Sequence, residues 1–129
     1  MNSTLAARPY SDKDYPTVLK WLTAQEWPPL PVEVLPKTGF IVDDYCAGFL
    51  YKTDSAIAWL EWVVANPDTD YNKRGEALDN LINSLVTEAK DQGFKIVLTS
   101  CQHNRLINRY DNHGFKITDK NMTNLMRVL

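Results

Sequence analysis

The chain has 129 residues, 44% of them hydrophobic, which is enough for one domain that buries roughly two-thirds of its unfolded surface. We therefore expect residues 1–129 to form a single domain. Its 14 Lys and Arg against 16 Asp and Glu give a net charge of -2, so it lacks the basic field of a non-specific nucleic-acid binder, and nucleic acid is not an expected partner.

The two cysteines, Cys46 and Cys101, lie far apart and lack the spacing of metal ligands. This pattern favours reduced thiols in a cytoplasmic protein, with neither a disulfide nor a bound metal. No run approaches the ~18 apolar residues of a membrane span, and residues 1–15 lack the apolar core of a signal peptide. We expect a cytoplasmic protein with no membrane partner.

The first third of the chain predicts a strand, a helix and a proline-rich loop. Residues 6–10 suit a short strand, and Ser11 or Asp12 is the predicted cap of the helix. The apolar stripe of this helix consists of Tyr15, Val18, Leu19 and Leu22. Residues 26–37 hold four of the seven prolines and cannot form a regular helix. Their many apolar side chains indicate a loop packed on the domain, which covers the core or lines a pocket.

Three strand-like runs follow. Residues 39–43 and Cys46–Lys52 are separated by two residues, which predicts a hairpin. A turn at 53–55 leads to a longer run, Ile57–Ala65, which Pro67 closes because proline cannot donate to a β-ladder. Short connections between successive strands imply an antiparallel meander.

The clearest helical pattern precedes Gly93, its expected C-terminal stop. Its apolar stripe consists of Ala77, Leu78, Leu81, Ile82, Leu85, Val86 and Ala89. Residues 95–100 suit a buried strand, and the long helix before them allows a right-handed crossover that makes this strand parallel to Ile57–Ala65.

A polar turn, residues 68–76, joins the long strand to this helix. Lys73, Arg74 and Gly75 lie at the helix start, where unpaired amides and the positive end of the helix dipole favour an anion such as phosphate. The same composition also fits an ordinary solvated loop.

The rest of the chain predicts one short helix and two strands. The helix spans residues 103–113 and ends at Gly114, and the strands are 115–118 and 123–128. The order of elements predicts an α/β (α+β) fold, in which a mixed, mostly antiparallel sheet is flanked by helices.

Three features resemble the GNAT family, the GCN5-related N-acetyltransferases. They are YDNHGF at residues 110–115, Arg8 followed by the acidic cap at Asp12–Asp14, and a strand that runs into Asn66 and Pro67. The first resembles the Tyr-x-x-x-Gly-Phe with which a helix of this family commonly ends. With WLEW and a closing DKN-x-T-N, the chain resembles small single-domain members from bacteria and phages. The resemblance implies the acyl-CoA N-acyltransferase fold, with acetyl-CoA as cosubstrate.

The family's motif, Gln/Arg-x-x-Gly-x-Gly/Ala, fits the polar turn in two registers. The first puts Asp70, Lys73 and Gly75 at its defined positions and keeps the spacing from Pro67, and we prefer it. The second spans residues 72–77. The resemblance implies that backbone groups at the end of the long strand bind the pantetheine arm and that the turn binds the pyrophosphate. The implied coenzyme-binding residues are Val63, Val64, Ala65, Asp70, Lys73, Arg74, Gly75, Glu76 and Ala77.

The resemblance also implies catalytic roles. Tyr110 sits where the family has a general acid that protonates the leaving thiolate, and Glu61 where it often has a base acting directly or through water. By strand alternation Glu61 shares a face with Trp59 and Val63, where burial raises a carboxyl pKa. His103 is a second candidate base, or the cap of the last helix. Tyr110 could also simply pack on the sheet, and Glu61 could form an ion pair.

Cys101 also lies near the implied thioester, but direct acyl transfer needs no nucleophile, so we expect an inert thiol. Four aromatic residues shape an acceptor pocket or fill the core: Trp27, Tyr45, Tyr51 and Trp59.

The predicted function is transfer of an acetyl group from acetyl-CoA to a primary amine of a small molecule or protein. The alternative is an inactive binding or regulatory module with a degenerate CoA site. The apolar tail is compatible with a homodimer.

Overall fold

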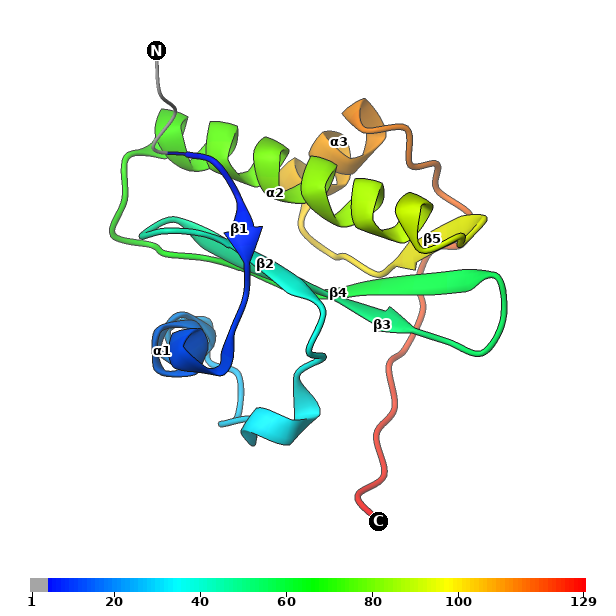
Figure 1. The fold of residues 1–129 in the computed structure, drawn as a ribbon, viewed down its shortest axis with the longest axis horizontal. Helices are drawn as coiled ribbons and strands as arrows, with labels where there is room; N and C mark the ends of the chain where they lie inside the picture. Colours follow the sequence, from blue (N-terminus) through cyan, green and yellow to red (C-terminus); the bar gives the residue numbers. More distant parts are fainter. Residues whose placement is uncertain (1–4) are drawn as a thin grey trace.

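A computed structural model describes residues 5–129 and centres on one five-stranded sheet, in the order β1-β2-β3-β4-β5 (Figure 1). The strands are β1 (Arg8–Pro9), β2 (Gly39–Val42), β3 (Cys46–Lys52), β4 (Ile57–Ala65) and β5 (Ile96–Thr99). Neighbours from β1 to β4 pair antiparallel, and β5 pairs parallel with β4. The predicted hairpin, meander and parallel crossover are confirmed.

Helices cover both faces of this sheet. They are η1 (Asp12–Asp14), α1 (Tyr15–Ala24), η2 (Val32–Val34), α2 (Tyr71–Asp91) and α3 (Asn104–Asn112). Figure 1 shows α2 and α3 on one side of the sheet and α1 on the other. The predicted stripe of α2 is buried at Ala77, Leu81, Ile82, Leu85 and Ala89. Within residues 5–129, no helix has the length and apolar character needed to span a membrane.

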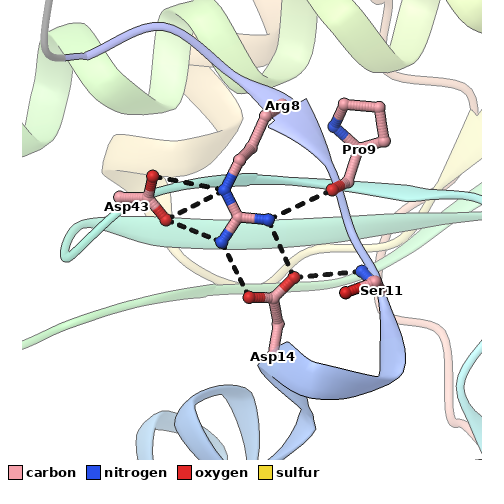
Figure 2. Close-up of polar contacts among 5 residues, drawn as sticks. All are labelled: Arg8, Pro9, Ser11, Asp14 and Asp43. Atoms are coloured by element: carbon pink, nitrogen blue, oxygen red, sulfur yellow. Dashed lines mark hydrogen bonds and ion pairs between the residues drawn. The ribbon is translucent and has the colours of Figure 1, made fainter.

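A cluster of charged side chains fastens β1 to its neighbours (Figure 2). The Arg8 guanidinium donates to both carboxylate oxygens of Asp14, at 2.7 and 3.0 Å, and to Asp43 at 2.7 Å. Asp14 also accepts from the Ser11 backbone N–H at 3.0 Å. Arg8 and the acidic cap, which the sequence presents together, therefore join β1, η1 and the turn after β2.

A bulge interrupts β4 near its middle. Trp62 has φ +58°, and the register between β3 and β4 shifts at Ala47 and Phe49. Leu60 and Val63 both pack in the cluster beneath α2, whereas strict alternation puts them on opposite faces. The expectation that Glu61 shares a face with Val63 is wrong, because the extra residue of the bulge reverses the alternation.

The tail differs most from the sequence prediction. Residues 115–129 contain no regular secondary structure, so the strands expected at 115–118 and 123–128 are wrong. Phe115 still packs against Tyr110 and the core, but the apolar side chains further on find no covering face among residues 5–129, as Leu125, 91% exposed, illustrates. A short strand pair without a buried face does not offset the entropy of ordering its backbone. The first strand is also shorter than expected.

Candidate active site

The site lies where β5 ends and β4 runs on beyond it. Their pairing ends with Leu60 opposite Thr99, although β4 continues to Ala65. The Thr99 hydroxyl donates to the Leu60 carbonyl at 2.8 Å and closes this last paired position. We call residues 61–65 of β4, together with residues 99–101 at the end of β5 and just after it, the fork. Among the described strands none pairs with the outer edge of β4 along the fork, so an extended ligand could hydrogen-bond there.

Glu61 supplies the carboxylate of the fork. It is the first residue after the part of β4 that pairs with β5, and it is half-buried. Burial raises its pKa, and hydrogen bonds from the Trp59 side chain and the Ser100 backbone only partly oppose that effect. A carboxylate with a raised pKa is a stronger base than one in water. Glu61 can therefore accept a proton at the fork.

Tyr110 comes from α3 and is buried. Burial raises the pKa of its phenol, the Thr99 side chain opposes this, and the nearby Cys101 and Glu61 add to it. The phenol therefore stays protonated and has a proton to donate. Two groups selected from distant parts of the sequence, Glu61 and Tyr110, interact electrostatically at the same fork.

Cys101 and His103 connect β5 to α3. The Cys101 sulfur accepts from the His103 backbone N–H at 3.3 Å, and burial raises the pKa of its thiol, which keeps the thiol neutral and unreactive. His103 is the N-cap residue of α3, but its side chain makes no capping hydrogen bond, and it is exposed. Within residues 5–129 no capping hydrogen bond engages its ring, which stays a candidate base.

The polar turn is held together by its own side chains. Asp70 is the N-cap residue of α2, and its carboxylate accepts from the Lys73 backbone N–H at 2.9 Å. Arg74 donates to the carbonyls of Asn66, Pro67 and Thr69 at 3.3–3.4 Å. Of the two cations expected to bind phosphate, Arg74 is therefore already engaged in the turn, whereas Lys73 is exposed.

The helix start also decides which amides of the turn are available. Because α2 begins at Tyr71, the amides of Glu76 and Ala77 lie within the helix, and the Ala77 side chain is in the core. Gly75 faces α3: a Cβ atom there would lie 3.0 Å from the Arg109 guanidinium. The amides without an intrahelical partner are those of the first turn, one of which Asp70 already caps.

A groove between α2 and α3 adjoins this turn and was not predicted. It has a volume of about 280 Å³ and is lined by Tyr71, Asn72, Gly75, Glu76, Asp79 and Arg109. Arg109 donates to the Gly75 carbonyl and pairs with Asp79, both at 2.9 Å. His113 contacts the same Asp79 at 2.9 Å. The spacing of Arg105, Arg109 and His113, four residues apart, is the sequence signal of one basic face on α3.

The opposite face of the sheet carries two of the predicted aromatic residues, Trp27 and Tyr51, whereas Tyr45 packs against the core cluster beneath α2. Trp27 packs edge-on against Trp62, with ring centroids 5.4 Å apart. The Trp62 indole donates to the Tyr51 hydroxyl, which donates to the Val34 carbonyl, each at 2.8 Å. The proline-rich loop is thus fastened to the sheet beside the fork, as expected of a packed loop. Among residues 5–129, no three His, Cys, Asp or Glu side chains gather as metal ligands would.

The fold, a five-stranded mixed sheet flanked by helices with β5 parallel to β4, matches that of solved acetyltransferase structures. No protein-family model and no curated protein sequence matches the chain. Solved structures match it by fold, at identities too low to show family membership.

One of them is a protein of Agrobacterium tumefaciens described as an acetyltransferase, with TM-score 0.71, 16% identity, and coverage of 95% of this chain and 99% of that one. A second is a protein of Mycobacterium tuberculosis crystallised with CoA, with TM-score 0.70, 14% identity and coverage of 92% and 76%. A third is glucosamine-6-phosphate N-acetyltransferase of Arabidopsis thaliana, with TM-score 0.66, 16% identity and coverage of 94% and 97%.

Proposed function

We propose that this protein is an acetyl-CoA-dependent N-acetyltransferase whose acceptor is a primary amine of a small molecule or a protein. The observation that carries the proposal is the fork, where β4 runs on past the end of β5 and the nearby Glu61 contributes to the raised pKa of the Tyr110 phenol. The fold neighbours, which include acetyltransferases and a CoA complex, support it. A cytoplasmic location and a homodimer belong to the same proposal.

The reaction is a direct transfer. Glu61, alone or through a water molecule, takes a proton from the acceptor amine, and the amine nitrogen attacks the thioester carbonyl. An N–C bond forms, the C–S bond breaks, and Tyr110 gives its proton to the departing sulfur. His103 is the second candidate for the base. The raised pKa of Glu61 and the neutral phenol of Tyr110 suit these opposite roles.

The coenzyme is assigned to the fork and the turn. Backbone groups of Val63, Val64 and Ala65 bind the pantetheine arm by hydrogen bonds of the kind that pair strands. The pyrophosphate lies at the start of α2, near the amides of its first turn and the exposed Lys73. A pyrophosphate bound there competes with the Asp70 carboxylate for the backbone amides of the first turn.

Two measurements test this proposal. Calorimetric titration of acetyl-CoA into the purified chain should give micromolar binding, and CoA release should be detectable with at least one amine from a panel of primary amines. Tyr110→Phe and Glu61→Gln should bind acetyl-CoA within about threefold of wild type, yet lower kcat by about 10²–10⁴-fold. Unchanged kcat in both variants, with intact folding by circular dichroism, would refute the assigned mechanism.

The pH profile separates a catalytic Glu61 from a structural one. Because the base acts only when deprotonated, kcat should fall as pH decreases through the raised pKa of Glu61. Glu61→Gln should lose this acidic limb along with most of the rate. A Gln variant that keeps the wild-type profile would mean that another group, with His103 as the first candidate, takes the proton.

One observation favours a second candidate function, a non-catalytic module that keeps the fold without the coenzyme. Asp70 brings a negative charge to the start of α2, where a pyrophosphate would bind, and side chains occupy positions that are glycine in the family motif. If a folded wild-type chain shows neither binding heat nor thermal stabilisation with acetyl-CoA, this second function replaces the first. The search would then turn to protein partners.

A further inference from the structure

Arg105, in the first turn of α3, is held in place by an aromatic ring rather than by an acid. Its guanidinium carbon lies 5.2 Å from the centroid of the Tyr71 ring, which belongs to the first turn of α2. Arg74 lies 5.9 Å from the same ring. Tyr71 is itself 56% exposed, so these contacts lie at the surface of the protein. Such cation–π contacts orient an arginine without consuming its hydrogen-bond donors.

The other arginines of this region, Arg74 and Arg109, each already have one guanidinium nitrogen, Nη1, engaged with neighbouring groups. Arg74 bonds three carbonyls of the turn, and Arg109 bonds the Gly75 carbonyl and Asp79. For Arg105, no hydrogen bond or ion pair with another residue in 5–129 is found; its only close partner is the Tyr71 ring. A guanidinium has five N–H donors, so Arg105 is oriented and able to bind an anion with several oxygens.

The position of this pair follows from the topology. The strands of the fork lead directly into the two helices: β4 runs through the polar turn into α2, and β5 runs through residues 100–103 into α3. Tyr71 and Arg105 therefore lie at the starts of the two helices that follow the fork. The groove lined by Tyr71, Gly75 and Arg109 continues from there between α2 and α3. A coenzyme with its pantetheine in the fork would extend past this pair.

We propose that Arg105, positioned by Tyr71, binds the 3′-phosphate of coenzyme A, with the adenosine in the groove between α2 and α3. This inference rests on the proposed function. A terminal phosphate monoester carries nearly two negative charges and three acceptor oxygens, and an arginine fork matches it well. The diphosphate has less charge per phosphorus and is assigned to the start of α2, where Asp70 is the N-cap residue. Arg105 thus makes the protein selective for CoA over the form that lacks this phosphate.

The test compares acetyl-CoA with 3′-dephospho-acetyl-CoA by calorimetry, using the full chain. Wild type should bind acetyl-CoA at least about tenfold more tightly, a typical effect of a charge-assisted contact. Arg105→Ala should reduce this preference to about twofold or less, because it should weaken the binding of acetyl-CoA and leave the binding of the dephospho form unchanged. Arg127→Ala, which removes the same charge from the exposed tail, is the matched control and should leave the preference unchanged.

Variants of the ring test the positioning. Tyr71→Phe keeps the aromatic face and should keep the preference, whereas Tyr71→Leu should lose a large part of it. The inference is overturned if wild type binds the two ligands equally tightly, if Arg105→Ala weakens the binding of both ligands equally, or if Tyr71→Leu leaves the preference unchanged. In the first two cases acetyl-CoA still binds and the proposed function stands. Absence of binding by either ligand would overturn the proposed function together with this inference.

Discussion

The two acids that share Arg8 should differ in what they contribute to stability, although both bond the same guanidinium (Figure 2). The Asp14 side chain is 12% exposed and also caps the Ser11 N–H, whereas the Asp43 side chain is 62% exposed. We predict that Asp14→Asn destabilises the protein clearly and that Asp43→Asn, the matched control, hardly does. The comparison isolates burial, because the partner cation is common to both.

The magnitudes follow from solvent screening. A hydrogen bond to a charged group contributes about 1.5–3 kcal/mol when shielded. Arg8 is 42% exposed, so the Asp14 interaction must be discounted. We expect about 1–2 kcal/mol for Asp14→Asn, and about 0–0.5 kcal/mol for Asp43→Asn, the value of a surface pair.

Urea unfolding at several pH values is the assay. Hydrogen bonds from Arg8 hold the pKa of Asp14 below its ordinary value, despite an opposing effect of burial. Its contribution is therefore complete above the unfolded pKa of about 3.9 and is lost as pH falls through the lower folded pKa. The difference between wild type and Asp14→Asn should shrink in that acidic range. Equal losses for Asp14→Asn and Asp43→Asn at pH 7 would refute the reasoning.

Two further predictions concern backbone space and charge. At Gly39 a Cβ atom would lie 2.6 Å from the Phe49 ring and 2.9 Å from the Gly48 carbonyl oxygen, so Gly39→Ala should cost about 1–3 kcal/mol in urea unfolding. Gly48→Ala, whose nearest contacts are side-chain ends at 3.0–3.3 Å, should cost less, and the reverse order would contradict the packing. Asp70→Asn keeps a good N-cap but removes a negative charge, so calorimetry should show acetyl-CoA binding several-fold more tightly at nearly unchanged stability. Asp91→Asn at the far end of α2 should not alter affinity; an equal gain there would point to net charge instead.

Patterns that act over a few residues were predictable. The apolar stripe of α2 repeats at helical period, Gly93 ends this helix region with φ +90°, and two residues separate the strands of the β2–β3 hairpin. Their signals lie within one or two turns of chain, where backbone sterics and side-chain spacing act directly. The parallel placement of β5 also followed, because one long helix connects it to β4.

The sequence by itself thus determined the elements up to residue 114, their order and the residues that could take part in chemistry. The tertiary structure decided which of them meet: the bulge at Trp62, the engagement of Arg74 with three carbonyls, and the ring of Tyr71 beneath Arg105. It also left residues 115–129 without the expected strands. The physical reason is that a side chain's partner and a strand's neighbour are chosen by packing between distant segments, and no local spacing encodes that choice.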